Sequence, residues 1–230
     1  MLNLKKQDVL FILIVLGLFL PFVLSGHLHA LYKTFNTAHP YIMAFIKFAL
    51  LSTLGECLGL RVKEGSYNKP GFGILPRMIV WGFLGVWIAA AMKTFAAGIP
   101  PFLQTLGIYD TGETLANSAL LKKIAGAFFI SLFMNTTFGP VFMTLHKISD
   151  MHILRYGGNI TALLKPIHFA DAFRRINWDV QWGFVFKKTI PFFWIPAHTI
   201  TFMLPPNMQV LFAALLGVAL GLILSIAARK

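Results

Sequence analysis

The chain has 230 residues, of which 57% are hydrophobic and only 12% are charged, with a mean hydropathy of +0.72 and a formal net charge of +12. Soluble domains carry about 25% charged residues, so the composition excludes an ordinary soluble fold and predicts one integral membrane domain over residues 1–230. The positive charge is expected at membrane-facing loops and not on a nucleic-acid-binding surface, because no polar segment carries a basic stripe with interleaved aromatic residues.

Six stretches are predicted as transmembrane helices, since a crossing needs about 20 mostly apolar residues. The first, residues 8–30, follows two lysines and is expected to be an uncleaved anchor, because no convincing cleavage site follows its long apolar run. The others are expected at residues 40–60, 75–96, 120–145, 182–204 and 208–228. The predicted fold class is therefore an all-α polytopic transmembrane helix bundle with about six spans, in which "LPPN" joins the last two as a hairpin.

Lysine and arginine are unevenly distributed between the predicted loops. With six spans, both termini and the two most basic loops fall on one side of the membrane, and only Lys122 and Lys123 clearly depart from this pattern. The asymmetry predicts a multi-pass protein with both termini in the cytosol, in the cytoplasmic membrane of a bacterium or an organelle membrane of a eukaryote. Membrane lipids are the expected partners, with anionic lipid at the basic face. Residues 160–182 fit either an interfacial amphipathic helix or a solvated loop.

Polar residues in the second and fourth predicted spans are candidates for the interior of the bundle, because ionisable groups are costly in lipid. Glu56 and Lys47 are nine residues apart, about half a turn out of phase, so they are not expected to pair within their helix. Glu56 also fits an interfacial carboxylate. Asn135 and Thr137 precede Pro140, whose ring frees a backbone carbonyl, so they fit either pore lining or repair of a kinked backbone.

The fifth predicted span carries a polar stripe of Trp194, His198 and Thr201, spaced i, i+4, i+7. Pro191 and Pro196 are expected to kink the helix. Such a stripe is not built to face lipid, so it is expected to meet other helices or a water-filled lumen. Interhelical hydrogen bonding is one interpretation, and a functional histidine that titrates near neutrality is the other.

This stripe resembles the end of the Mpv17/PMP22 family, written W-P-x-x-Q-x-x-N-F-x-x-V-P-x-x-x-R and followed by a span that closes in L-S. Here the frame reads "WIPAHTITFMLPP", and the last span closes in Leu224-Ser225. His198 stands at the glutamine position and Thr201 at the asparagine position, while the arginine of the family has no counterpart.

The resemblance extends upstream, over residues 40–226. "HPYIMAFIKFALLSTLGE" is similar to the opening helix of the family, with Gly55-Glu56 in place of Gly-Asp. Arg77 and Gly82 resemble an arginine and a glycine of its second helix, and "MNTTFGP" resembles D-Q-x-x-x-x-P without the acidic residue. The resemblance implies a divergent member, prokaryotic in one interpretation, of a family described as four-helix proteins of organelle membranes with channel-like behaviour. The helix at residues 8–30 would be an addition.

The polar residues favour a channel or pore for small solutes or ions. The candidate lining residues are Glu56, Asn135, Thr137, Trp194, His198 and Thr201. A non-transporting structural or partner-binding membrane protein is the alternative. No enzyme, cofactor or metal site is expected, because no nucleophile or nucleotide motif appears and no two histidines fall at a metal-ligand spacing within one helix. Gly217 and Gly221 form G-x-x-x-G, which permits close helix contact within the chain or in a homo-oligomer.

Overall fold

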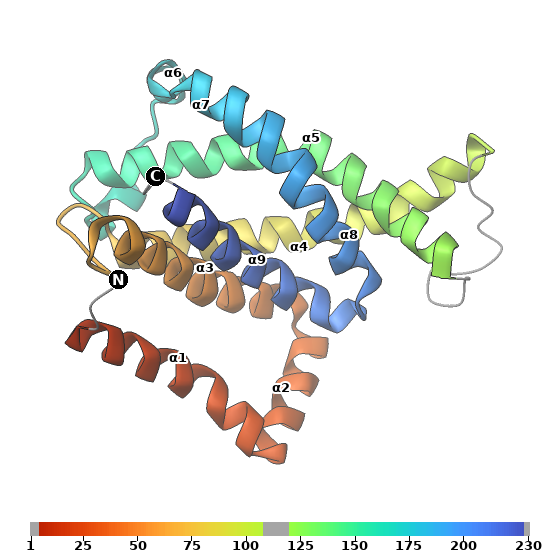
Figure 1. Cartoon of the computed structure of the whole chain (residues 1–230), viewed down its shortest axis with the longest axis horizontal. Coiled ribbons are helices and arrows are strands. Elements are labelled where there is room, and N and C mark those ends of the chain that lie inside the picture. The colour runs from red at the N-terminus through yellow and green to blue at the C-terminus, as the bar shows by residue number, and fades with distance from the viewer. Residues whose placement is uncertain (1–4, 108–119, 228–230) are drawn as a thin grey trace.

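The protein is built from helices throughout residues 5–107 and 120–227, the parts that this computed structural model describes, with side chains described as far as Leu222 (Figure 1). No strand occurs in these stretches, which confirms the predicted all-α class. The elements in chain order are α1 (Lys6–Leu24), α2 (Gly26–Ala38), α3 (Pro40–Glu64), α4 (Ile74–Thr105), α5 (Leu120–Arg155), the 3-10 turn η1 (Ile160–Leu164), α6 (Phe169–Arg175), α7 (Trp178–Val180), η2 (Gln181–Trp194), α8 (Ile195–Met203) and α9 (Pro206–Ala227).

Four of these helices, α1, α3, α4 and α5, are long and apolar enough to cross a membrane. A helix stands at each of the six predicted spans, but among the residues that the structure describes, length and composition support four crossings, so six are not confirmed. The part of α9 whose side chains are described, Pro206–Leu222, is apolar but shorter than a crossing. The fifth predicted span is divided between η2 and α8, which follow each other as one rod in Figure 1.

The helices share two ends. The start of α1, the loop between α3 and α4, the end of α5 and the end of α9 lie together in Figure 1. We name this the basic end, because it carries Arg61, Lys63, Lys69, Arg155, Arg174 and Arg175. The opposite end, here named the far end, holds α2, the end of α4, the start of α5 and the turn between α8 and α9.

The core lies between α3, α4, α5, α8 and α9. Its buried apolar residues are Phe48, Leu51, Met92, Ile99, Leu103, Ala127, Ile130, Met134, Phe202, Ala213 and Ala214. α9 packs along α3 at small residues, since a Cβ on Gly55 would lie 2.9 Å from the Cα of Val218, and one on Gly221 would lie 3.4 Å from the Gly55 carbonyl oxygen. The G-x-x-x-G motif of α9 is therefore used within the chain.

α1 stands largely outside this core, with only 6% of its most apolar 18-residue window buried. It is attached at the basic end, where Asp8 accepts hydrogen bonds from Arg61 Nε at 2.7 Å and Arg61 Nη2 at 2.6 Å. The Tyr67 hydroxyl donates to the same carboxylate at 2.9 Å, and its ring stacks on Phe11 with centroids 4.5 Å apart. One ion pair thus connects the additional helix to the end of α3, and one aromatic stack connects it to the loop that follows.

Alkaline solution is expected to weaken this attachment. Burial and the hydrogen bond to Asp8 raise the pKa of Tyr67 above its usual value of about 10. When a pKa is higher in the folded protein than in the unfolded chain, the group stabilises the fold fully at pH values below its unfolded pKa. That stabilisation is lost as the pH rises through the folded pKa. Between about pH 8 and about pH 12, the thermal midpoint of unfolding should therefore fall less steeply in Tyr67→Phe than in the wild type. Tyr41→Phe alters an exposed tyrosine and should behave as the wild type does. Equal slopes of the thermal midpoint against pH in Tyr67→Phe and Tyr41→Phe would contradict the stabilising role of the Tyr67 hydroxyl.

The predicted proline kinks take a different form. η2 is a π-helix of 14 residues that contains Pro191, and Pro196 lies in the first turn of α8. Pro191 removes one backbone N–H donor from η2, and Pro196 lies where the N–H groups of α8 are least needed. Pro140 lies inside α5, where the Thr144 hydroxyl donates to its carbonyl at 2.7 Å. The helices continue through all three prolines.

Candidate functional site

Five polar or charged side chains from three helices meet in one network towards the basic end. We name it the ionic cluster, and its members are Glu56 of α3, Arg77 and Trp81 of α4, and His146 and Asp150 of α5. Arg77 is central, since its Nη1 donates to both Glu56 and Asp150. The Arg77 residue is only 5% exposed. The cluster joins α3, α4 and α5 through charge-assisted hydrogen bonds, which are stronger than neutral ones.

The backbone around Arg77 fixes its position. α4 begins after Gly73, whose carbonyl accepts from the Arg77 N–H at 3.1 Å, and Gly73 adopts φ +71°, a left-handed conformation that favours glycine. Arg77 Nε donates to the Phe72 carbonyl at 2.7 Å, and its guanidinium lies 4.5 Å from the Phe72 ring centroid. Phe72 thus contacts one side of the guanidinium, and the carboxylates of Glu56 and Asp150 bond to it elsewhere.

Glu56 has three partners. Its Oε2 accepts from Arg77, and its Oε1 accepts from Trp81 Nε1 at 3.0 Å and lies 3.1 Å from His146 Nε2. His146 also lies 3.7 Å from Asp150, one turn further along α5. Glu56 is therefore a multiply bonded carboxylate between α3, α4 and α5.

The charge of the ionic cluster depends on one proton. Arg77 remains protonated at any physiological pH, so it balances only one of the two carboxylates, Glu56 and Asp150. A proton on His146 brings the cluster to neutrality, and its loss leaves one negative charge inside the bundle. Two acids, one guanidinium and one imidazole in contact therefore form a group that can take up and release a proton between α3 and α5.

Three members of the ionic cluster also have the separation of metal ligands, since one ligand atom each from Glu56, His146 and Asp150 lies within 4.8 Å of the others. Arg77 already bonds to both of these carboxylates. A divalent cation in the same place would have to displace a guanidinium or lie beside it, which Coulomb repulsion disfavours. The cluster fits a proton better than a metal ion.

A second network, which we name the amide cluster, joins α5 to α8 and consists of Ser131, Asn135 and His198. The Asn135 Nδ2 donates to the Ser131 carbonyl at 2.8 Å, and the Ser131 hydroxyl donates to the Ile195 carbonyl at 2.8 Å. His198 Nδ1 lies 3.1 Å from Asn135 Oδ1, an acceptor, so the neutral imidazole carries its proton on Nδ1 in this arrangement. The amide cluster holds the α5–α8 interface by side-chain and backbone bonds together.

Trp194 covers the amide cluster. Its ring stacks on His198 with centroids 5.2 Å apart, and its Nε1 is buried without a hydrogen-bond partner among the residues that the structure describes. The Thr201 hydroxyl, fully buried one turn beyond His198, donates to the Ala197 carbonyl at 2.9 Å. An indole N–H left unpaired in the interior is a donor that is available to a polar solute.

Aromatic residues separate the two clusters. Asn135 and His146 are eleven residues apart, or about 16 Å along α5 at 1.5 Å per residue. Phe138 and Phe142 occupy the turns between them, and Trp87 of α4 contacts both, with ring centroids 4.7 and 6.0 Å away. Trp81 continues the contact to Phe142 and to His146, so one layer of rings spans the distance. We name Trp81, Trp87, Phe138 and Phe142 the aromatic layer.

The predicted lining residues therefore divide into groups. Glu56 belongs to the ionic cluster, Asn135 and His198 to the amide cluster, and Trp194 and Thr201 lie beside the latter. The rings of Phe138 and Phe142 lie between the two clusters, so the structure brings these described residues into two sites and not into one ring. Thr137 is exposed, and its hydroxyl donates to the Phe133 carbonyl at 2.6 Å, which is not the carbonyl that Pro140 frees.

His146 and Asp150 were not predicted. The fourth span was expected to end at residue 145, whereas α5 continues to Arg155, so both residues were assigned to a loop. The sequence does contain a signal for them, since His and Asp four residues apart lie on one face of a helix. Charged residues in a helical extension were interpreted as a basic loop, and this interpretation was wrong.

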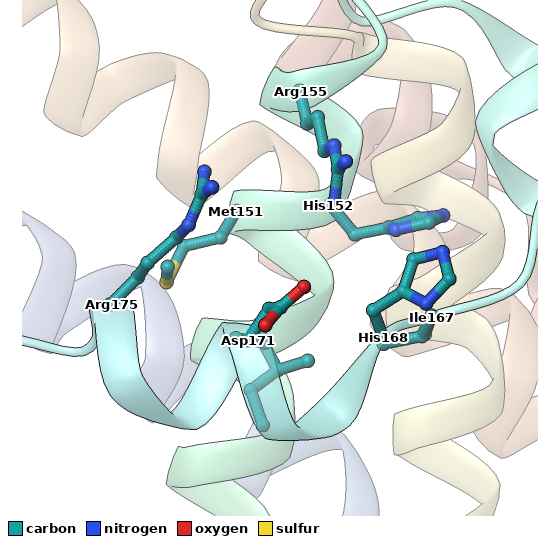
Figure 2. Close-up of a pocket in the computed structure, with 9 residues that line it drawn as sticks. Met151, His152, Arg155, Ile167, His168, Asp171 and Arg175 are labelled. Atoms are coloured by element: carbon teal, nitrogen blue, oxygen red, sulfur yellow. The ribbon is translucent and has the colours of Figure 1, made fainter.

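A separate small pocket lies beyond the ionic cluster at the basic end, where α6 packs across the end of α5 (Figure 2). It has a volume of about 60 Å³. Four of its lining residues are histidines or arginines, namely His152, Arg155, His168 and Arg175, and one is acidic, Asp171. Exposed Phe169, Phe173 and Trp178 flank it on α6 and α7, so this segment has the aromatic and basic composition of a membrane interface.

Comparisons with known protein families, with curated proteins and with solved structures found no match to this chain. The class is therefore defined by the fold and the site alone. The chain is a membrane-embedded all-helical bundle with four helices long enough to cross a bilayer, one polar cluster between α3, α4 and α5 and a second between α5 and α8.

Proposed function

We propose that the protein is a multi-pass channel for small solutes or ions, closed in the conformation described here. The observation that carries the proposal is the ionic cluster, because four ionisable side chains are retained between helices in a region where lipid-facing charge is costly. The polar route would run from the ionic cluster to the amide cluster, with the aromatic layer as the constriction. Hydrophobic constrictions of this kind close pores by excluding water.

A non-transporting membrane protein is the second candidate, and a specific observation favours it. The polar groups of both clusters bond mainly to one another, and the rings of the aromatic layer fill the turns of α5 between them. In that case the clusters would hold α3, α4, α5 and α8 in register. Conduction, and not the arrangement of side chains, distinguishes the two functions.

We also propose that the chain is a divergent member of the Mpv17/PMP22 family. Positions from separate motifs of that resemblance meet in pairs: Glu56 with Arg77, and Asn135 with His198. These contacts support the family proposal together with the spacing of the motifs, and the cost of polar groups in lipid favours such contacts in any helix bundle.

The basic end is proposed to face the cytosol and to contact anionic lipid. One support is its arginines and lysines, because such residues are enriched in loops on the cytosolic side of a membrane. The other is the basic pocket of Figure 2, which lies beside the exposed aromatic residues of α6. The membrane would be the cytoplasmic one in a bacterium or an organelle membrane in a eukaryote.

Solute flux from liposomes tests the function. Removing the constriction in the double variant Trp87→Ala/Phe142→Ala is expected to raise flux by at least about tenfold, which corresponds to a barrier lower by about 1.4 kcal/mol. Phe83→Ala is the matched control, since Phe83 is a ring of α4 that is 66% exposed. Release of potassium, chloride and glycerol would be followed separately, so that charge and size selectivity are measured together.

Two further variants identify the route. Glu56→Gln removes one negative charge and is expected to change the ratio of cation to anion flux, whereas His198→Ala removes a bulky ring and is expected to change the rate. Empty vesicles give the baseline. Flux equal to that of empty vesicles for the wild type, the double variant and both single variants would refute conduction and leave the non-transporting function.

A further inference from the structure

A cleft at the far end of the molecule is distinct from both polar clusters. It has a volume of about 260 Å³ and lies between α2, α3 and α9. Its lining residues are Asn36, Thr37, Pro40, Lys47, Pro206, Asn207 and Val210. An engineered cavity of about 150 Å³ accommodates benzene, so this cleft has room for a small ligand together with water.

Lys47 brings a positive charge into the cleft. The residue is only 6% exposed, so its ammonium group does not reach the surface as an ordinary lysine would. Its Nζ donates to the side-chain oxygen of Asn36 and lies 5.3 Å from the centroid of the Tyr32 ring. Both partners are neutral. An ammonium group has three donors, and one of them is used in this arrangement.

No carboxylate balances this charge among the residues that the structure describes. The acidic residues within residues 5–107 and 120–227 are Asp8, Glu56, Glu64, Asp150, Asp171 and Asp179, and they lie in the first turn of α1, in the second half of α3, near the end of α5, in α6 and in α7. The nearest along α3 is Glu56, which is nine residues away, out of phase, and engaged with Arg77. A buried ammonium without a counter-charge is costly, so the site gains most from a ligand that supplies a negative charge.

The surrounding backbone favours the same charge. α3 begins at Pro40 and α9 at Pro206, and both of these residues line the cleft. The first turn of a helix carries the positive end of the helix dipole, and the first turns of both helices border the cleft that holds Lys47, although Pro40 and Pro206 themselves have no N–H to donate. The Asn36 amide reaches only the Asn207 carbonyl, at 3.5 Å, the limit of a hydrogen bond, and is therefore a further donor.

We propose that this cleft binds a small oxyanion, either a carboxylate or a phosphate group, through Lys47 and the Asn36 amide. The ligand has two sources with the same chemistry: a free anion that enters from the far side of the membrane, or the phosphate of an anionic lipid whose headgroup reaches between α2 and α9. The site requires no conduction, so it stands whether or not the protein is a channel.

Binding by the full chain in lipid nanodiscs tests the site. In the first arm the nanodiscs contain phosphatidylcholine alone, and inorganic phosphate and acetate are titrated at a constant ionic strength set with chloride. The heat of binding and the thermal midpoint of unfolding are recorded. In a second arm, nanodiscs contain phosphatidylglycerol and no added phosphate or acetate. A rise in the midpoint in the first arm identifies a free anion, and a rise only in the second identifies a lipid headgroup.

Variants assign the effect to the cleft. Lys47→Met keeps the length of the side chain without its charge, and it is expected to lose the anion-dependent rise and at least about tenfold in affinity, a loss typical of one charge-assisted contact. Lys93→Met is the matched control, since Lys93 is an exposed lysine of α4 at the same end. It should bind as wild type does.

A second variant keeps the test decisive if Lys47→Met does not fold. Asn36→Asp places a carboxylate next to the ammonium, so an internal ion pair replaces the ligand. This variant is expected to have a higher thermal midpoint than the wild type without anion, and to show no further rise with phosphate or with phosphatidylglycerol. Anion binding that is unchanged in Lys47→Met or in Asn36→Asp, or a wild type that responds in neither arm, would overturn the proposal.

Discussion

Replacement of Arg77 by methionine is expected to lower the free energy of unfolding by about 3–5 kcal/mol, the usual cost of leaving a buried charge without its partner. Arg77 holds Glu56 and Asp150 together, and without the guanidinium two carboxylates would face each other between α3 and α5. They would either repel or take up a proton, and each outcome costs stability at neutral pH. Unfolding in mixed micelles with a denaturing detergent measures the loss.

Three comparisons make this result specific. Neutralising the acids as well, in Arg77→Met/Glu56→Gln/Asp150→Asn, should recover most of the stability, because no unpaired charge remains. Arg77→Lys should lie between wild type and Arg77→Met, since one ammonium cannot bond to two carboxylates and the Phe72 carbonyl in the same planar geometry. Arg174→Met breaks an exposed ion pair with Asp171 and should cost less than about 1 kcal/mol. A loss of the same size in Arg174→Met would show that the effect is general and not due to burial.

Helices and their approximate places were predictable because a bilayer-length apolar run is a local property of the sequence. The ends of helices were less so. α5 continues ten residues past the predicted end of its span, since a helix can leave the apolar layer without ending, and hydropathy cannot detect this. The π-helical winding of η2 was equally beyond prediction, because two prolines in a span predict a disturbance without specifying its form.

The candidate site was predictable only in part, because the sequence shows local properties of each residue and not its contacts with distant helices. That Glu56 and His198 would turn inward follows from the cost of polar groups in lipid, which applies to each residue separately. Which residues they meet depends on contacts between distant helices: Glu56 with His146, ninety residues away, and His198 with Asn135, sixty-three residues away. A single shared lumen was expected because the polar residues were counted without the rings of Phe138 and Phe142 that lie between them.

Gly158→Ala is expected to be a strongly destabilising glycine substitution near the ionic cluster. Gly158 has φ +73°, and a Cβ there would lie 2.7 Å from the Gly73 nitrogen and 2.8 Å from the Gly71 carbonyl oxygen. These are backbone atoms that cannot rotate away. The left-handed conformation costs about 1–2 kcal/mol for a residue with a Cβ, and overpacking adds about 1–3 kcal/mol, so unfolding should become easier by about 2–5 kcal/mol.

The adjacent glycine separates these two contributions. Gly157 has φ +63°, yet a Cβ there meets no atom within 4 Å, so Gly157→Ala should lose only the conformational term of about 1–2 kcal/mol. The difference between the variants measures how closely the loop after α5 packs on the start of α4. Because the Gly73 carbonyl accepts from the Arg77 N–H, displacing Gly73 should also weaken the ionic cluster, and Gly158→Ala should then reduce the additional loss caused by Arg77→Met. Equal losses in the two glycine variants would mean that this contact does not position Arg77.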